Sequence, residues 1–339
     1  MKTAIDLFCG CGGTTQGLQD AGFEVVGGVD ISTSALKVFK ANFENARAIQ
    51  ANLFDLTPSE LLDRVGMKKG ELDLLAGCPP CQAFSGMRTR NGSRNTTDER
   101  TELVSVFVKF VIGIQPKAFA FENVPGLWGK SEIEDAISKL RLSGYSTDAG
   151  IVDAQKIGVP QRRRRLIALG SKHKQPKVVY DNGERKNVAE AISHLPIAGT
   201  SGDHAHDLPE NRSARIRELI SLIPKNGGSR KSLPDKFVLT CHRKYPHGFK
   251  DVYGRMSWEK PAPTITGGCA SPSKGRFLHP EEDRCITIRE AATLQGFPEN
   301  FVFPRNLSKS ELAVMIGNAL PPRLIEVQAR SLFETAHAE

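Results

Sequence analysis

AIDLFCGCGG, residues 4–13, joins a short apolar run to a loop that contains three glycines. The run at residues 4–8 has the composition of a strand, and residues 14–21 after the loop have the pattern of a helix. Glycines between a strand and a helix let the backbone approach a bound cofactor closely. The stretch therefore predicts an α/β fold whose first loop binds a cofactor.

The same alternation of apolar runs and amphipathic stretches continues along the chain. We expect further strands at residues 24–29, 72–76, 117–121 and 165–169, and helices at residues 32–43, 102–114 and 132–142. Strands and helices that alternate at this spacing predict a parallel, doubly wound sheet. Because single cores stop growing at about 250 to 300 residues, a chain of 339 residues predicts a second, smaller domain.

The glycine loop departs from the fingerprint of a dinucleotide site. With Gly10 and Gly12 as the first two glycines of a G-x-G-x-x-G pattern, the third position is Thr15. Asp30, at the end of the second predicted strand, is placed to bind ribose hydroxyls. A loop for a nucleoside without a pyrophosphate fits better, which favours S-adenosylmethionine as the cofactor.

The segment GCPPCQAFSG, residues 77–86, presents Cys81 shortly after a predicted strand. Pro79 and Pro80 fix their own φ angles and restrict the residues before them, which stiffens the loop. Because open parallel sheets bind ligands at the carboxyl ends of their strands, Cys81 is a candidate nucleophile. A buried structural cysteine is the alternative.

The chain has seven cysteines, an odd number that indicates reduced thiols rather than a disulfide framework. A four-thiolate zinc site can be drawn from Cys9, Cys11, Cys78 and Cys81. Cofactor binding explains the surrounding glycines better, and no second ligand set completes a finger or ribbon, so we expect no metal. No run approaches the ~18 apolar residues of a membrane helix and the first residues do not resemble a secretory signal, which predicts a cytoplasmic protein.

Two polar clusters follow predicted strands or lead into them. Glu122, in the sequence Phe-Glu-Asn-Val, should reach the same sheet edge as Cys81, with a turn or helix-capping carboxylate as the alternative. In QRRRR, residues 161–165, the alternate residues Gln161, Arg163 and Arg165 would share one face of an extended segment. That face is a candidate part of an active site, whereas a basic surface run is the commoner meaning of four arginines.

The net charge of +8 comes from one region of the chain. Residues 171–280 contain 19 Lys and Arg against 10 Asp and Glu, and seven of the eight histidines, while the remainder is close to neutral. The region has little regular periodicity, so it predicts a loop-rich domain that faces a polyanion, with nucleic acid as the favoured partner. An ordinary solvated basic face has a similar composition.

Taken together, these motifs resemble those of the DNA (cytosine-5) methyltransferase family over almost the whole length. DLFCGCGG is similar to the family's cofactor loop, PPCQAFSG to its nucleophile loop, ENV to its glutamate motif and QRRRR to its Gln-x-Arg-x-Arg motif. REAATLQGFP, residues 289–298, and GNALPP, residues 317–322, resemble the late motifs of the family. The resemblance implies a Rossmann-like catalytic domain at residues 1–170, a target-recognition domain at 171–283, and a returning region at 284–339 with a helix near 324–335.

The resemblance also assigns roles to individual residues. Cys81, Glu122, Arg163 and Arg165 would be catalytic, and Gln82, Ser85, Asn123 and Gln161 would contact the substrate. The implied cofactor contacts are Phe8, Cys9, Gly10, Cys11, Gly12, Gly13, Asp30, Ile31, Asn52, Leu53, Pro80, Leu103, Asn318 and Ala319. Three positions depart from the commonest family pattern, with Asp30 in place of glutamate, Asn52 in place of aspartate and Leu320 in place of valine.

The implied reaction begins with addition of the Cys81 thiolate to carbon 6 of cytosine, which makes carbon 5 nucleophilic toward the methyl group of S-adenosylmethionine. The base must first be flipped out of the duplex. We expect a monomer that acts on a short sequence in double-stranded DNA and serves as the partner of a restriction endonuclease. A transfer-RNA cytosine methyltransferase and a catalytically silent nucleic-acid-binding protein are the alternatives.

Overall fold

The computed structural model describes residues 1–80, 98–244 and 250–333. Within these ranges the chain forms two compact units. Unit 1 is drawn from Met1–Ile157, Arg164–Gly183 and Ala319–Glu339, and unit 2 from Gly158–Arg163 and Glu184–Asn318. The chain therefore leaves unit 1, builds unit 2 and then returns to unit 1.

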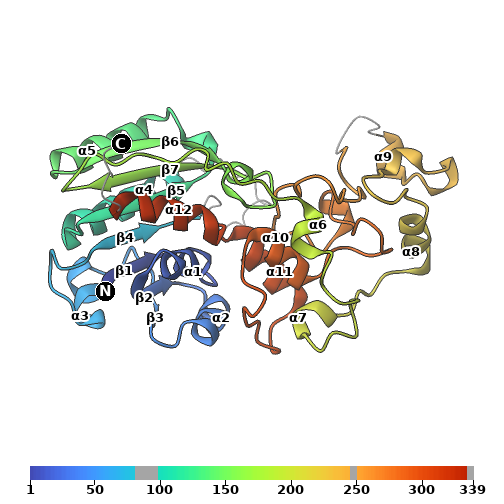
Figure 1. Cartoon of the computed structure of the whole chain (residues 1–339), viewed down its shortest axis with the longest axis horizontal. Coiled ribbons are helices and arrows are strands. Elements are labelled where there is room, and N and C mark those ends of the chain that lie inside the picture. Colours follow the sequence, from blue (N-terminus) through green and yellow to red (C-terminus); the bar gives the residue numbers. More distant parts are fainter. Residues whose placement is uncertain (81–97, 245–249, 334–339) are drawn as a thin grey trace. The chain divides into compact units, whose positions relative to one another are not determined.

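Unit 1 contains a seven-stranded sheet of order β3-β2-β1-β4-β5-β7-β6 (Figure 1). The strands are β1 (Lys2–Leu7), β2 (Phe23–Asp30), β3 (Arg47–Gln50), β4 (Leu74–Gly77), β5 (Ala118–Asn123), β6 (Ser146–Asp153) and β7 (Arg164–Ser171). The first five in this order run parallel, which confirms the predicted sheet. The order of β1 between β2 and β4 makes the sheet doubly wound.

The last two strands differ from the prediction, because β7 runs antiparallel to both β5 and β6. Only ten residues separate Asp153, at the end of β6, from Arg164, at the start of β7. A parallel crossover needs about a dozen residues or more, so this connection permits only the antiparallel arrangement. As a result β7 starts at the edge where β5 ends, with Leu166 paired to Asn123.

Helices cover both faces of the sheet (Figure 1). One face packs on a core of apolar side chains from the sheet and from three adjacent helices. The helices of unit 1 are α1 (Gly13–Asp20), α2 (Thr33–Asn42), α3 (Pro58–Val65), α4 (Asp98–Ile114), α5 (Ser131–Leu142) and α12 (Pro322–Phe333), with single turns η1 (Pro125–Leu127) and η2 (Ala154–Ile157). The core lies against α3, α4 and α5, so these helices fix one side of the parallel strands.

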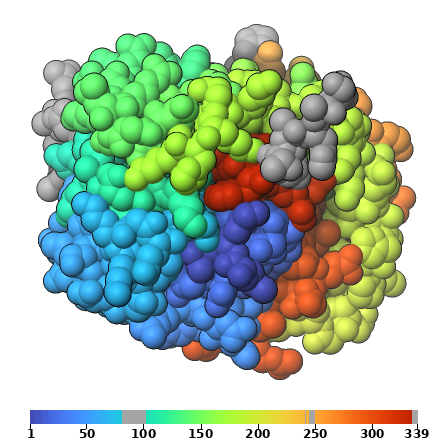
Figure 2. Space-filling model, turned by 60° about the vertical axis from the view of Figure 1, so that its left-hand side comes forward, coloured from blue at the N-terminus to red at the C-terminus, as the bar shows by residue number. Residues whose placement is uncertain are grey.

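Helix α12 completes unit 1 from the far end of the sequence. It packs against α1, where a Cβ on Gly17 would lie 2.1 Å from the carbonyl oxygen of Pro322. The side-chain amide of Gln328 exchanges two hydrogen bonds with the backbone of Val179. In Figure 2 the red atoms of this segment lie between the blue start of the chain and the yellow-green residues after β7. The close approach at Gly17 explains why a side chain is excluded there.

Unit 2 consists of short helices and single turns joined by long loops. Its elements are α6 (Val188–Ile192), α7 (His204–Asp207), α8 (Ala214–Ser221), α9 (Thr240–Lys244), α10 (Ile288–Gln295) and α11 (Lys309–Asn318), with η3 (Arg230–Ser232), η4 (Asp235–Phe237) and η5 (Pro272–Lys274). A small apolar core joins α8 to Leu233, Phe237 and Tyr253. Buried arginines bind many of the loop carbonyls, as described below.

Candidate active site

Several candidate residues meet at the carboxyl edge of the sheet in unit 1. The strand register aligns Leu7 with Val29 and with Gly77, and Gly77 with Phe121, so the segments that follow β1, β2, β4 and β5 leave from one edge. The start of β7 reaches the same edge because that strand is antiparallel. This edge therefore collects the glycine loop, Asp30, the Pro79-Pro80 turn, Glu122 and Arg165.

The glycine loop is tightened around Asp30. The Asp30 carboxylate accepts hydrogen bonds from the backbone N–H of Gly10 and of Ser32, both at 2.8 Å. Gly12 has a φ of +103°, and a Cβ at that position would lie 2.1 Å from the ring of Phe43, so only glycine fits. Since each carboxylate oxygen can accept a second hydrogen bond, Asp30 retains acceptors for a ligand.

Three groups that can lose a proton are buried in this loop or in the strand before it, namely the thiols of Cys9 and Cys11 and the carboxyl group of Asp6. Burial raises the pKa of Cys11 to about 12 and raises the pKa of Cys9 above its ordinary value. Burial also raises the pKa of Asp6 to about 7, against a 2.7 Å hydrogen bond donated by the hydroxyl of Thr15. The other oxygen of Asp6, Oδ1, has no hydrogen-bond partner among the described residues. Cys9 and Cys11 are thus protonated thiols at neutral pH.

The zinc alternative gains no support from the described residues. Cys9, Cys11 and Cys78 do not form a group of metal-ligand distance within the described chain. The sulfur of Cys78 instead lies 3.3 Å from the hydroxyl of Thr14, which links the loop after β4 to the start of α1.

The remaining predicted cofactor residues occupy different parts of the fold. Ile31 follows β2 with 46% of its surface exposed, whereas Leu53 and Leu103 are buried. The side chain of Asn52 accepts from the N–H of Phe54 at 3.1 Å and donates to Asp55 at 3.0 Å. Phe8 is half-buried with a φ of 62°, and Gly13 is the first residue of α1. Asn318 is the exposed last residue of α11 in unit 2, and Ala319 is the first residue of the segment that returns to unit 1.

These residues fit a nucleoside that carries positive charge. The loops at residues 8–15, 30–32 and 51–55 contain no Lys or Arg, so they offer no cation to a pyrophosphate. They contain the carboxylates of Asp30 and Asp55 instead, which accept hydrogen bonds from hydroxyl or amino groups and attract cations. These hydrogen-bond acceptors and negative charges therefore suit a cationic nucleoside better than a dinucleotide.

The catalytic candidates Glu122 and Arg165 form an ion pair. The Nε of Arg165 lies 2.7 Å from Oε1 of Glu122, and both side chains are largely buried, with 15% and 9% exposed. Glu122 is the second-last residue of β5, and Arg165 is the second residue of the antiparallel β7. The guanidinium stabilises the ionised carboxylate and holds it in one orientation.

Asn123 connects this pair to the loop that leads toward Cys81. Its side-chain N–H donates to the carbonyl of Pro79 at 3.3 Å, and its Oδ1 accepts from the backbone N–H of Val124 at 2.8 Å. Pro80 is exposed. The predicted residues Cys81, Gln82 and Ser85 lie outside the described residues. Asn123 therefore fixes the backbone two residues before the candidate nucleophile.

The first half of the QRRRR motif has a different environment. Gln161 is fully buried in unit 2, where its amide accepts from Ile265 N–H and donates to Gln295 and to the carbonyl of Leu294. Arg163 is also buried, and it donates to the carbonyls of Ile265 at 3.0 Å and Gly317 at 3.1 Å. The motif thus contributes Gln161 and Arg163 to unit 2 and Arg165 to unit 1.

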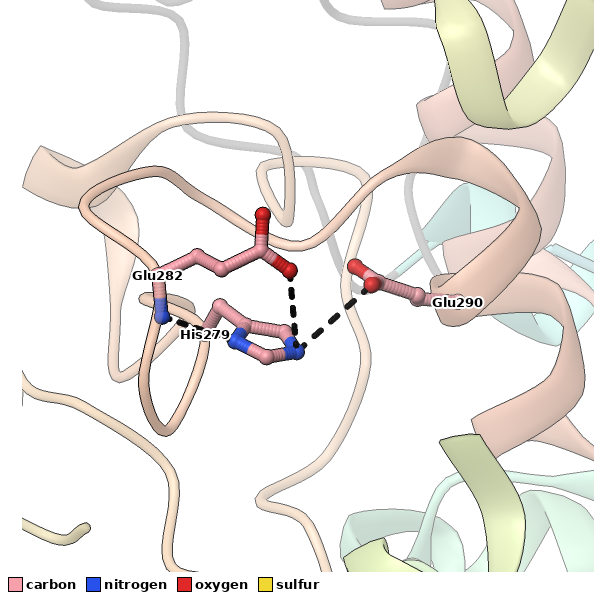
Figure 3. A group of neighbouring side chains, drawn as sticks. All are labelled: His279, Glu282 and Glu290. Carbon is pink, nitrogen blue, oxygen red and sulfur yellow. Dashed lines mark hydrogen bonds and ion pairs between the residues drawn. The ribbon is translucent and has the colours of Figure 1, made fainter. Parts of the chain in front are cut away.

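A histidine and two glutamates in unit 2 lie within metal-ligand distance of one another (Figure 3). The Nδ1 of His279 accepts from the N–H of Glu281 at 3.2 Å and of Glu282 at 3.0 Å, which places the ring proton on Nε2, the atom that faces Glu282 and Glu290. Arg284 binds both carboxylates through bidentate pairs. Because the carboxylates are neutralised and Nε2 is protonated, this cluster is a structural network.

Residues 2–334 match the family described as C-5 cytosine-specific DNA methylase. The chain belongs to this family. The match confirms the resemblance inferred from the motifs, and the methylase is an enzyme that acts at carbon 5 of cytosine in DNA. None of the helices in the described part of this methylase has the length and apolar character that a bilayer crossing requires.

Individual relatives agree with the family. The chain is 32% identical to the Type II methylase M.HgiDII of Herpetosiphon aurantiacus, with 97% of this chain and 94% of the relative covered. It is also 32% identical to the Type II methyltransferase M1.HphI of Haemophilus parahaemolyticus, with 98% and 87% covered. A crystal structure of a prophage-encoded E. coli protein described as a DNA modification methyltransferase is similar, with a TM-score of 0.70, 25% identity and 98% and 99% covered. These likenesses confirm the predicted fold class.

The sequence motifs did not reveal several residues that organise the site. The hydrogen bond between Asp6 and Thr15 was not predicted, although both residues belong to the motifs of the first loop, and the link between Thr14 and Cys78 joins residues 64 positions apart. Asn123 was predicted to contact substrate, whereas its recorded bonds hold the backbone of Pro79 and Val124. The one signal available in advance was position, since all of these residues flank the ends of predicted strands.

Proposed function

We propose that this methylase transfers a methyl group from S-adenosylmethionine to carbon 5 of a cytosine flipped out of duplex DNA, through a transient bond to Cys81. The observation that carries the proposal is the Glu122–Arg165 ion pair at the sheet edge. Asn123, next to Glu122, binds the backbone that leads toward Cys81. A fixed carboxylate beside the backbone that leads to the nucleophile would favour addition to a pyrimidine ring by holding the reacting groups close together.

The methyl donor would be held by the edge residues of unit 1. Asp30 would accept hydrogen bonds from ribose hydroxyls, and the loop of Gly10 and Gly12 would approach the methionyl part. Ile31, Asn52, Leu53 and Leu103 would surround the adenine, with Asn318 and Ala319 near the pocket. When bound, the donor supplies an electrophilic methyl group beside carbon 5 of the base.

The protein groups would act on the base in a defined order. The Cys81 thiolate adds to carbon 6, while Glu122 contacts ring nitrogen 3 and the amino group and draws electron density from the ring. Arg165 keeps Glu122 in place and supplies the positive charge that a thiolate needs, since a free thiol has a pKa near ~8.5. After carbon 5 is methylated, a base removes its proton and Cys81 is eliminated. Gln161 and Arg163 serve as positioning residues, because their recorded bonds lie inside unit 2.

Unit 2 would supply target recognition, with the recognition domain falling within residues 171–283. Flipping the cytosine costs a few kcal/mol, which contacts to the pocket and to the remaining duplex would offset. The names of the two Type II relatives support a place in a restriction-modification system, in which the methylase would protect host DNA from a cognate nuclease. We expect it to act as a monomer.

A tritiated-methyl transfer assay on duplex DNA and on total transfer RNA tests the proposal. We expect label in duplex DNA, and we expect Cys81→Ser to abolish turnover while it retains affinity for the donor. Duplexes containing 5-fluorocytosine should trap a stable adduct with the wild-type protein. Label in transfer RNA alone would contradict the substrate, and undiminished methylation by Cys81→Ser would remove that residue from the mechanism.

A further inference from the structure

The basic side chains of unit 2 fall into two groups. The first group is committed to the fold, since each member bonds to backbone carbonyls or to carboxylates within unit 2. Its members are Arg163, Arg212, Arg255, Arg276, Arg284 and Arg289. These arginines contribute to the net charge of the sequence, but their guanidinium groups already have internal partners. A polyanion must therefore be bound by the second group, which consists of the other lysines and arginines of unit 2.

The second group is concentrated in one stretch of the sequence. Residues 229–250 contain six Lys and Arg and a single Asp, whereas residues 184–222 contain five basic and six acidic residues. Residues 251–284 contain five of each. More than half of the excess positive charge of residues 171–280 therefore lies within these 22 positions. We call its described part, residues 229–243, the basic segment.

The fold presents the basic segment in a fixed conformation. Leu233 and Phe237 are buried in the small apolar core of unit 2, where Leu233 directly follows η3 and Phe237 is the last residue of η4. The side chain of Ser229 caps η3 by accepting from the N–H of Lys231. Lys231 and Lys236 are exposed on the same short stretch whose apolar side chains point into the core. Their backbone is thus positioned before any partner binds.

The charge on this surface has little local compensation. Within the described chain, neither Lys231 nor Lys236 takes part in an ion pair, although the ammonium of Lys236 lies 5.0 Å from the ring centroid of Phe237. Lys225, by contrast, pairs with Asp283 just outside the segment. Partial burial, together with the nearby Arg230 guanidinium, lowers the pKa of His242, so this ring is neutral at pH 7. Arg243 donates to the carbonyls of Asp235 and Val238, which holds α9 against η4 and leaves its positive charge exposed. Asp235 is the one carboxylate of the segment.

We propose that the exposed face of the basic segment binds the phosphate backbone of duplex DNA, with Lys231 and Lys236 as direct phosphate contacts. The inference rests on the proposed function and adds to it the place where unit 2 meets its substrate. Lysine binds phosphate as a point charge and carries no base code, so these contacts set the position of the duplex and not its sequence preference.

The double variant Lys231→Gln/Lys236→Gln tests the proposal in the full-length protein. Each lost phosphate contact lowers the salt dependence of log K by about 0.9, which corresponds to roughly eightfold in affinity at ~0.1 M monovalent salt. We therefore expect the double variant to bind duplex DNA several tens of times more weakly, and equally so for target and non-target sequences. Its melting temperature and its affinity for the methyl donor should equal those of the wild type.

Lys186→Gln/Lys260→Gln is the matched control. It removes two exposed lysines of the same unit that lie beside the carboxylates of Glu184, Glu190 and Glu259 in the sequence. We expect this control to retain the affinity and salt dependence of the wild type. An equal loss in both double variants would indicate a general effect of net charge and would overturn the assignment to the basic segment.

The remaining outcomes separate this inference from the proposed function. If the wild type methylates duplex DNA and Lys231→Gln/Lys236→Gln binds it with unchanged affinity and salt dependence, the inference is wrong and the proposed function stands. If the wild type neither binds nor methylates duplex DNA, both are wrong. A loss of affinity confined to the target sequence would also overturn the inference, because it would indicate base reading.

Discussion

The two units of this methylase are held together by different means. Unit 1 is organised by a seven-stranded sheet whose apolar residues pack against α3, α4 and α5. Unit 2 has no strand of its own in the described chain beyond isolated bridges, and its loops converge on buried arginines. Arg255 is fully buried and donates to the carbonyls of Ile220, Ile223, His279 and Glu282.

The contrast follows from what backbone groups need when they leave water. A sheet satisfies its carbonyls through its own ladder, whereas a buried loop must find donors elsewhere. Arginine supplies five donors in one planar group, so a single side chain closes several loop ends at once. Unit 1 therefore holds the candidate catalytic side chains at the edge of a sheet, and unit 2 holds irregular loops, to which the proposed function assigns the contact with DNA. Three changes test whether the two units can be perturbed separately.

The largest effect is expected from Glu122→Gln in unit 1. The amide keeps the size of the side chain but removes the charge that pairs with Arg165. It also removes the carboxyl group that would contact ring nitrogen 3 and the amino group of the base. Loss of one general acid–base group lowers rates by about 10²- to 10⁴-fold. We expect the rate of methyl transfer to fall within this range while affinity for donor and duplex is retained.

Glu134→Gln, an exposed glutamate on α5, is the control for the loss of one carboxylate from unit 1. It should transfer methyl groups at the wild-type rate. Single-turnover measurements with radiolabelled donor distinguish the two variants. A normal rate for Glu122→Gln would refute its assigned role and with it the idea that unit 1 contains the chemistry.

A smaller effect, confined to unit 2, is expected from Arg255→Met. The methionine keeps much of the volume but leaves four backbone carbonyls, three of them in buried hydrogen bonds, without this donor. Removal of a buried charged group that holds several partners costs about 3 to 5 kcal/mol. We expect duplex binding to be lost and protease cleavage within unit 2 to accelerate, while the donor still binds unit 1. Isothermal titration measures the affinities for donor and for duplex, and limited proteolysis measures the rate of cleavage within unit 2.

Arg305→Met removes an exposed arginine of the same unit and should leave both binding reactions unchanged. If Arg255→Met instead abolished donor binding together with duplex binding, the two units would unfold as one. The apolar core of unit 1 and the arginine contacts of unit 2 would then not stabilise the two units independently.

The smallest effect concerns the pH dependence of unit 1. Burial raises the pKa of Asp6 from 3.8 to about 7, so the folded state binds a proton that the unfolded state releases. The contribution of Asp6 to stability is therefore complete below pH 3.8 and is lost as the pH rises through about 7. Between these values the free energy of unfolding should fall by at most about 1.4 kcal/mol per pH unit. Asp6→Asn should remove this slope.

Urea unfolding at a series of pH values between 5 and 7 measures the slope, and Asp63→Asn, an exposed residue of α3, is the matched control. The control should retain the wild-type slope. An identical pH dependence in Asp6→Asn and the wild type would show that Asp6 is ionised in the folded protein at all of these values.

The same contrast decides how much of the molecule the sequence predicts. Apolar runs such as Leu74–Gly77 and Ala118–Asn123 are long enough and apolar enough to mark buried strands, and the predicted parallel order is confirmed for these. The strands Arg47–Gln50 and Ser146–Asp153 were missed because polar residues interrupt them. An apolar pattern predicts a strand only where that strand is buried. These two strands lie at the edges of the sheet, so the pattern did not predict them.

The sequence predicted the residue types of the candidate site better than it predicted the contacts between them. Glu122 was expected at the edge that carries Cys81, whereas a fully parallel sheet would have placed the start of the strand with Arg165 at the opposite edge. Gln161 and Arg163 were expected to share a face with Arg165, whereas their bonds go to unit 2. Alternation within a strand cannot reveal that the chain passes from one unit to the other at Arg164.

The return of α12 to the sheet has a consequence for biosynthesis. The ribosome must make Glu184–Asn318 of unit 2 before the residues that pack on α1 emerge, which at about 5 to 20 residues per second takes on the order of 10 s. Throughout that interval the face of α1 at Gly17, which α12 later covers, has no partner from the C-terminal segment. The growing polypeptide thus passes through a stage that chaperones are suited to protect, and unit 1 is complete only after unit 2 has been translated.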